Sequence, residues 1–225
     1  MLGAVIFDFD GVIADSESLH LRSFNMVLAQ YGIEIKPKDY YRDFLGLTDL
    51  DCFKLLVSKR LGLAEKQVSE LVAQKEKTFA RLLRDGGCVI EGVRDFLNIL
   101  GQNRIPMAVC SGALLAEIEL LLEQSGLRDF FEQIVSAEQV KKGKPNPECF
   151  LVTLEKLNRN RSNPIVNEQC IVIEDSHWGL EAAQAARMHT IAVTNSYDAE
   201  ELTMAEKTVS RLDELTIQQL QDLCS

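Results

Sequence analysis

Two aspartates near the N-terminus, Asp8 and Asp10, follow a run of apolar residues, 4–7. Side chains two residues apart on an extended backbone point to the same side, so these carboxylates should lie close together. Two adjacent like charges need a counter-ion, or one of them must carry a proton. Either state is useful, because a carboxylate can attack phosphorus and a carboxyl can protonate a leaving oxygen. The alternative is a loop of solvated aspartates.

A second acidic pair, Glu174-Asp175, follows another apolar run, 171–173. Carboxylate oxygens suit Mg²⁺, which takes few protein carboxylates and keeps several waters. Ser176 is a good N-cap for a helix that begins at His177, so its role is at least partly structural. The two acidic pairs together indicate a magnesium site.

Two further segments could bind a phosphate. Ser111-Gly112 follows the apolar run 107–110 and offers a hydroxyl and backbone N–H groups at a helix N-terminus, although a Ser-Gly pair is usually just a turn.

Lys144 precedes Asn146 and Pro147, which are typical of an N-cap and of a first helical residue. Lys144 would then lie just before a helix, where its charge could reach the phosphate. Lys141 and Lys142 are expected to be solvated.

Short apolar runs and helical patterns alternate along most of the chain. Unbroken runs of three to five apolar residues are typical of strands buried on both faces. Their alternation with helices predicts a parallel sheet covered by helices. Ligands bind outside the carboxyl ends of such strands, where the polar residues above occur. The expected strands are 4–7, 107–110, 134–135, 171–173 and 191–193, and the expected helices include 113–124 and 147–157.

The interval from about residue 16 to residue 83 breaks this alternation. It contains helical patterns and no convincing strand, and Gly32, Gly46, Gly62 and Gly86-Gly87 punctuate or follow them. The sequence therefore predicts an α/β protein with a Rossmann-like three-layer core and a mostly parallel sheet, residues 1–15 and 87–225. A small all-helical domain, residues 16–86, is inserted after the first strand. Its expected helices are 17–30, 50–60 and 65–83.

Net charge, apolar stretches and cysteine spacing argue against several classes of function. The 225 residues carry a formal net charge of -10, which disfavours nucleic acids and anionic membranes. No apolar stretch approaches the roughly 18 residues of a membrane span, and no signal peptide is visible. The six cysteines lack metal-knuckle spacing and are expected to be buried in a reducing cytosol. We expect a cytoplasmic protein that binds neither nucleic acid nor membrane, and a monomer, with a dimer as the alternative.

Four motifs, in order, resemble those of the haloacid dehalogenase (HAD) superfamily, and the helical insert resembles its small cap domain. The subgroup that the sequence is most similar to is that of the β-phosphoglucomutase-like and CbbY-like phosphatases and mutases. The motifs are Asp8-x-Asp10-Gly-Val, Ser111, Lys144-Pro-x-Pro and Glu174-Asp175-Ser-x-x-Gly179.

The resemblance implies a role for each core residue. Asp8 would be the nucleophile and a Mg²⁺ ligand, and Asp10 the general acid/base with its backbone carbonyl on the metal. Asp175 would be a metal ligand, and Glu174 either a ligand or a partner of the ligands. The transferring phosphoryl group would be held by Ser111, with Gly112, and by Lys144.

The resemblance also implies substrate-binding roles in the cap for His20 and Lys75. The alternatives are an ordinary helix position for His20, and Lys77 in place of Lys75. The mutases carry an arginine for a second phosphate three residues after the glycine that corresponds to Gly46, and here Asp49 stands instead. A carboxylate would repel that phosphate, which favours a phosphatase over a mutase.

The expected function is therefore the Mg²⁺-dependent hydrolysis of a small phosphorylated metabolite, a sugar or polyol monophosphate, through an aspartyl-phosphate. The first alternative is a sugar phosphomutase of the β-phosphoglucomutase type. An alternative of another class is a non-catalytic protein that binds a phosphorylated ligand or regulates a partner. A dehalogenase would need neither a metal nor an acid/base, and a phosphonatase would need a cap lysine that the sequence does not assign.

Overall fold

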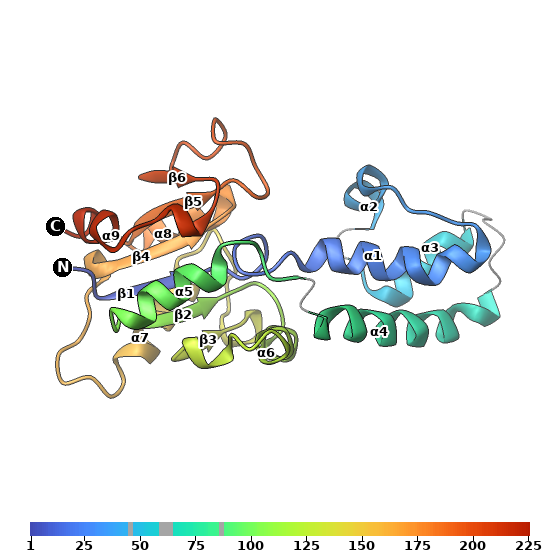
Figure 1. Cartoon of the computed structure of the whole chain (residues 1–225), viewed down its shortest axis with the longest axis horizontal. Helices are drawn as coiled ribbons and strands as arrows, with labels where there is room; N and C mark the ends of the chain where they lie inside the picture. The colour runs from blue at the N-terminus through green and yellow to red at the C-terminus, as the bar shows by residue number, and fades with distance from the viewer. Residues whose placement is uncertain (45–46, 59–64, 86–87) are drawn as a thin grey trace. The chain divides into compact units, whose positions relative to one another are not determined.

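The computed structural model describes residues 1–44, 47–58, 65–85 and 88–225. Its contacts divide the chain into two compact units, which we call the core and the cap (Figure 1). The core comprises Met1–Asp15 and Val89–Ser225, and the cap comprises Ser16–Cys88. The expected boundary between residues 86 and 87 lies outside the described residues, as do Gly46 and Gly62.

The core contains a six-stranded sheet in the order β3-β2-β1-β4-β5-β6, and every neighbouring pair is parallel. The predicted α/β class and parallel sheet are thus confirmed, with β6 as an edge strand that the sequence did not indicate. The strands are β1 (Ala4–Phe7), β2 (Met107–Cys110), β3 (Gln133–Val135), β4 (Cys170–Glu174), β5 (His189–Val193) and β6 (Lys207–Val209).

Helices cover both faces of this sheet, as the unbroken apolar runs of β1 and β4 require. Ala4 and Ile6 belong to the apolar cluster that α7 and α8 complete on one face. Phe7 points to the other face, where its ring lies 6.1 Å from that of Phe96 in α5. The helices of the core are α5 (Val93–Gln102), α6 (Leu115–Gln124), α7 (Glu148–Asn158), α8 (His177–Ala185) and α9 (Ile217–Leu223).

Two helix starts differ in how well the sequence predicted them. Ser176 caps α8 as expected, because its side chain accepts a hydrogen bond from the N–H of Gly179 at 3.2 Å. The predicted start of α7 is wrong by one residue. Pro147 is the N-cap, and the Asn146 side chain accepts a hydrogen bond from the N–H of Glu148 at 3.1 Å.

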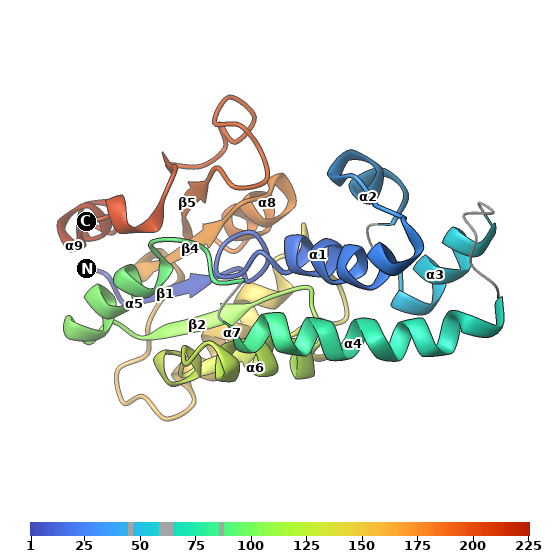
Figure 2. The ribbon, with the colours of Figure 1, turned by 45° about the vertical axis from the view of Figure 1, so that its right-hand side comes forward.

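The secondary structure of the cap is entirely helical in its described residues, with irregular links such as 33–36, and α1 and α4 run side by side (Figure 1, Figure 2). It has an apolar cluster of its own, in which the rings of Phe24 and Phe53 lie 5.2 Å apart. Residues 59 and 60 of one expected helix lie outside the described residues, and α2 was not expected. The helices of the cap are α1 (Ser16–Leu28), α2 (Pro37–Asp43), α3 (Asp49–Ser58) and α4 (Val68–Arg84).

All six cysteines are buried free thiols. Within the described part of the chain, none of the helices combines the length and the apolar character that a membrane span requires. Single 3₁₀ turns complete the structure: η1 (Ala29–Tyr31), η2 (Glu65–Gln67), η3 (Arg128–Phe130), η4 (Ala137–Gln139), η5 (Asn167–Gln169) and η6 (Leu212–Glu214).

Candidate active site

Three neighbouring strands end in polar side chains at one edge of the core sheet. β1 lies between β2 and β4, so the residues that follow them are brought together. Asp8 follows β1, and its N–H donates to the carbonyl of Ile173 in β4 at 2.9 Å. Ser111 follows β2, Glu174 is the last residue of β4, and Asp175 comes next. The three strands run in the same direction, so these residues lie at the carboxyl ends of the strands, where open parallel sheets bind ligands.

Lys144, from the loop before α7, lies between two of these carboxylates. Its Nζ is 2.5 Å from Oδ1 of Asp8 and 2.5 Å from Oε1 of Glu174. It also donates to the carbonyl of Cys110 at 3.1 Å. The lysine side chain is only 15% exposed. An ammonium group this deep in the protein needs charged partners and hydrogen bonds, and it has both.

The carboxylates of Asp8, Glu174 and Asp175 form a buried acidic cluster, in which one oxygen from each lies within 4.8 Å of the others. Three carboxylates face one ammonium group, so negative charge is in excess. Hard oxygen donors with such an excess fit a divalent cation such as Mg²⁺. Asp10 is half-buried in the turn after Asp8, and its carboxylate is not one of these three.

Two glycines of the motifs make room for the cluster. A Cβ added to Gly179 would stand 1.8 Å from Cδ of Glu174, and one added to Gly11 would stand 1.8 Å from Oδ2 of Asp175. Gly11 also has a φ of 77°, which residues with a Cβ rarely adopt. Each glycine thus allows a carboxylate to pack directly against the backbone.

Both oxygens of Glu174 are bound by protein donors. Lys144 binds Oε1, while Oε2 accepts from the hydroxyl of Ser176 at 3.0 Å and from the N–H of Asp175 at 3.2 Å. Ser176 therefore serves Glu174 as well as α8. This arrangement holds Glu174 against Lys144.

Burial controls the protonation of the cluster. It raises the pKa of Asp8, against the opposing charge of Lys144, and the carboxylates of Glu174 and Asp175 raise it further. Burial likewise raises the pKa of Asp175 to about 6, although a hydrogen bond from Ser196 opposes the rise. Burial opposes the charge on Lys144, but Asp8 and Glu174 outweigh that effect and raise its pKa. A divalent cation would favour the ionised carboxylates.

A cavity of about 230 Å³ opens beside Lys144. It is lined by the other two residues that were predicted to hold the transferring phosphoryl group. Ser111 and Gly112 line it together with Lys144, so the structure brings these three together. Lys141 also lines the cavity and is exposed. The hydroxyl of Ser111 accepts from the N–H of Ala113 at 3.0 Å. Since α6 begins only at Leu115, the Ser-Gly pair precedes the helix by a short loop.

In the cap, Lys75 is buried in a polar cluster of its own. Its Nζ lies 2.7 Å from Oδ1 of Asp49 and 2.6 Å from Nδ1 of His20. The side chain is 1% exposed, and Nζ is 4.9 Å from the ring centre of Phe79. Lys77, the alternative to Lys75, is exposed. The charge of Asp49 is thus paired with that of Lys75, which the sequence did not reveal.

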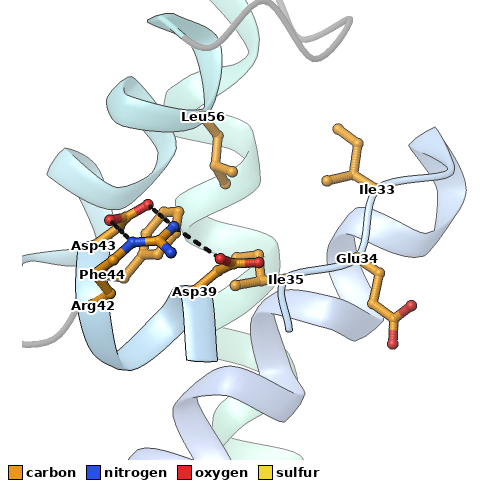
Figure 3. Close-up of a pocket in the computed structure, with 8 residues that line it drawn as sticks. All are labelled: Ile33, Glu34, Ile35, Asp39, Arg42, Asp43, Phe44 and Leu56. Atoms are coloured by element: carbon orange, nitrogen blue, oxygen red, sulfur yellow. Dashed lines mark hydrogen bonds and ion pairs between the residues drawn. The ribbon is translucent and has the colours of Figure 1, made fainter. Parts of the chain in front are cut away.

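A second cavity, of about 260 Å³, lies within the cap and contains none of the predicted site residues (Figure 3). Arg42 lines this cavity, and its guanidinium group forms ion pairs with Asp39 and Asp43, each with an N–O distance of 2.8 Å. An arginine with two carboxylate partners is a poor anion ligand, so the lining of this cavity does not favour a phosphate. The cavity is lined by Ile33, Glu34, Ile35, Asp39, Arg42, Asp43, Phe44 and Leu56.

Sequence reasoning missed the loop after β5. The hydroxyl of Ser196 donates a hydrogen bond to Oδ2 of Asp175, and Nδ2 of Asn195 donates to the carbonyl of Gly11 at 2.7 Å. A signal was present, because Asn195 and Ser196 follow the apolar run of β5 just as the motif residues follow theirs. Only the strand order shows that β5 is the neighbour of β4.

The sequence and the fold are similar to those of known phosphatases and related proteins. The chain is 33% identical over 195 residues to a phosphorylated carbohydrates phosphatase of Thermotoga maritima, covering 84% of this chain and 83% of that protein. It is 30% identical over 219 residues to hexitol phosphatase B of Escherichia coli, covering 96% of each.

Among solved structures, a Thermotoga maritima protein provisionally described as a beta-phosphoglucomutase superposes with a TM-score of 0.77 at 29% identity. The match covers 98% of this chain and 99% of that one. Residues 5–193 match the haloacid dehalogenase-like hydrolase family, a range that includes all four motifs. The chain therefore belongs to the haloacid dehalogenase-like hydrolase family.

Proposed function

We propose that this protein is a Mg²⁺-dependent phosphatase that hydrolyses a sugar or polyol monophosphate through an aspartyl-phosphate on Asp8. The observation that carries the proposal is the convergence of Asp8, Lys144, Glu174 and Asp175 at one sheet edge, beside the cavity lined by Ser111. The named activities of the related phosphatases, on phosphorylated carbohydrates and hexitols, support this class of substrate.

Lys144, Ser111 and Gly112 would bind the phosphoryl group. Lys144 supplies positive charge to the phosphoryl oxygens, where charge must be stabilised during transfer. Ser111 and Gly112 supply a hydroxyl and backbone N–H groups. Because Lys144 also contacts Asp8, the lysine brings the phosphate and the nucleophile together.

Asp8 would attack phosphorus, and the ester P–O bond would break as the Asp8–phosphorus bond forms. The carboxyl of Asp10 would give its proton to the departing alcohol oxygen. The resulting carboxylate of Asp10 would then take a proton from water as the water oxygen attacks phosphorus. Cleavage of the Asp8–phosphorus bond returns the Asp8 carboxylate and releases inorganic phosphate.

Asp8, Asp175 and the backbone carbonyl of Asp10 would hold Mg²⁺, which supplies positive charge to the transferring phosphoryl group when bound. The three carboxylates of the acidic cluster and their single lysine fit a divalent ion. Since both oxygens of Glu174 are already bound by protein donors, we assign it the task of holding Lys144.

From the resemblance we retain the proposals that residues 16–86 act as a cap domain and that His20 and Lys75 bind the substrate. The pairing of Lys75 with Asp49 supports a monophosphate substrate, because it leaves this cluster without a net positive charge for a second phosphate. The phosphomutase remains the second candidate because of the similarity to the Thermotoga maritima structure described as a beta-phosphoglucomutase.

A panel of about a hundred phosphorylated metabolites, incubated with Mg²⁺ and scored for phosphate release, tests the proposal. Sugar and polyol monophosphates should be hydrolysed by the wild type and not by Asp8→Asn. β-Glucose 1-phosphate with a bisphosphate primer tests the alternative: glucose 6-phosphate formed without stoichiometric phosphate release would favour the mutase. A non-catalytic protein would release phosphate from no substrate.

A further inference from the structure

The loop after β5, residues 194–197, contacts the acidic cluster from a side that the four motifs do not cover. The hydroxyl of Ser196 donates a hydrogen bond to Oδ2 of Asp175. Asp175 is buried, with 6% of its surface exposed, so the orientation of its carboxylate depends on a small number of neighbours. Both residues belong to the core, so this contact lies within one unit.

The same loop holds the turn that follows Asp10. Nδ2 of Asn195 donates to the carbonyl of Gly11 at 2.7 Å. A Cβ added to Gly11 would stand 1.8 Å from Oδ2 of Asp175 and 3.0 Å from the hydroxyl of Ser196. The carboxylate, the turn and the serine therefore pack so closely that residue 11 has no space for a side chain.

The loop is fixed at both ends. The N–H of Thr194 donates to the carbonyl of Val209 in β6 at 3.1 Å. The ring of Tyr197 lies 4.6 Å from the ring of His177 and 6.5 Å from that of Trp178, at the start of α8. Since α8 begins two residues after Asp175, Tyr197 ties the loop to the helix that directly follows the carboxylate.

We propose that Ser196 is a positioning residue for the divalent-cation site, because its hydrogen bond to Oδ2 fixes the orientation in which the Asp175 carboxylate meets the cation. This inference rests on the metal site of the proposed function and adds a residue that the four motifs do not contain. Donors behind a metal ligand typically contribute about 10–100-fold to metal affinity. Ser196 is exposed, so water can replace a missing hydroxyl, and we expect an effect near the lower limit.

Calorimetric titration of the metal-free full chain with Mg²⁺ alone tests the role of Ser196. Ser196→Ala should raise the Kd for Mg²⁺ about tenfold, and Ser196→Thr, which retains a hydroxyl, should restore the affinity. Ser210→Ala is the matched control, since Ser210 donates to Oε1 of Glu214 at 2.5 Å, outside the acidic cluster. It should leave the Kd unchanged. The fluorescence of Trp178, the single tryptophan, provides a second measurement of Mg²⁺ binding, because this residue lies three residues from Asp175.

Asp175→Asn separates a failure of this inference from a failure of the proposed metal site. If Asp175→Asn loses Mg²⁺ binding while Ser196→Ala binds like the wild type, the role of Ser196 is wrong and the metal site stands. If Asp175→Asn binds Mg²⁺ like the wild type, both are wrong. Turnover by Ser196→Ala should need about tenfold more Mg²⁺ for half-saturation, with kcat largely recovered at saturation. A fall in kcat at unchanged Mg²⁺ affinity would also overturn the inference.

Discussion

Replacement of Lys144 by methionine should destabilise the metal-free protein, and more strongly at neutral than at acidic pH. The lysine side chain is 15% exposed, and those of its partners Asp8 and Glu174 are 12% and 1% exposed. Both contacts are 2.5 Å long, so the variant leaves two buried carboxylates without their counter-ion. Removing one member of such a buried group costs about 3–5 kcal/mol.

The pH dependence follows from the charges that remain. Burial and the neighbouring carboxylates raise the pKa of Asp8, while Lys144 opposes the rise. Without the lysine this pKa rises further, so the folded variant takes up a proton as the pH falls. Protonation removes the uncompensated charge, so the deficit in the free energy of unfolding should be largest at pH 7.5 and smaller at pH 5.

Urea unfolding of metal-free wild type and Lys144→Met at both pH values measures this deficit. Lys141→Met, at an exposed lysine of the same loop, is the control and should change stability by no more than about 0.5 kcal/mol. An equal deficit at pH 7.5 and pH 5 would refute the electrostatic explanation and leave only lost packing. No deficit at either pH would show that the ion pairs do not form.

Three further predictions concern the carboxylates and a glycine. Asp8→Asn should abolish phosphate release while the thermal unfolding temperature shows that the fold is intact; unchanged turnover would contradict the nucleophile. Chelation should stop turnover and added Mg²⁺ should restore it, whereas activity that survives chelation would rule out the metal role. Gly179→Ala should destabilise the protein by about 1–3 kcal/mol in urea unfolding, because its Cβ would stand 1.8 Å from Cδ of Glu174; wild-type stability would contradict this contact.

The last prediction uses Asp175. Burial raises the pKa of its carboxyl group from 3.8 to about 6. The folded metal-free protein then binds a proton that the unfolded chain has lost, so this group lowers stability as the pH rises from 4 to 7. Asp175→Asn should gain up to about 3 kcal/mol over the wild type across that interval. A constant difference in unfolding free energy would contradict the raised pKa.

The sequence was sufficient for the parts of the site that follow directly from strand ends. Asp8, Ser111 and Glu174-Asp175 each come after an apolar run long enough to be a buried strand, and the parallel arrangement brings the runs to one edge. Strand β6, Lys207–Val209, was missed because it is short, lies at the sheet edge and has two half-buried residues among three. No unbroken apolar run marks it.

Contacts between residues far apart in the chain could not be predicted in this way. The Lys75–Asp49 pair joins α4 to the start of α3 across 26 residues, and no local pattern indicates which face of α4 is buried against which carboxylate. Ser196 and Asp175 are 21 residues apart and meet only because β5 pairs with β4. The motif residues could be identified from the sequence, whereas the polar partners that orient them required the fold.

The separate apolar cluster of the cap has an evolutionary consequence. Phe24, Tyr40 and Phe53 pack with one another in one cluster, and the sheet has its own apolar layers, which include Phe7 and Phe150. Substitutions among the cap helices can therefore accumulate without disturbing the strands that carry the carboxylates. Under the substrate-binding role proposed for the cap, a lineage of such enzymes can change the alcohol portion that it accepts while the machinery that breaks the phosphate ester is inherited unchanged.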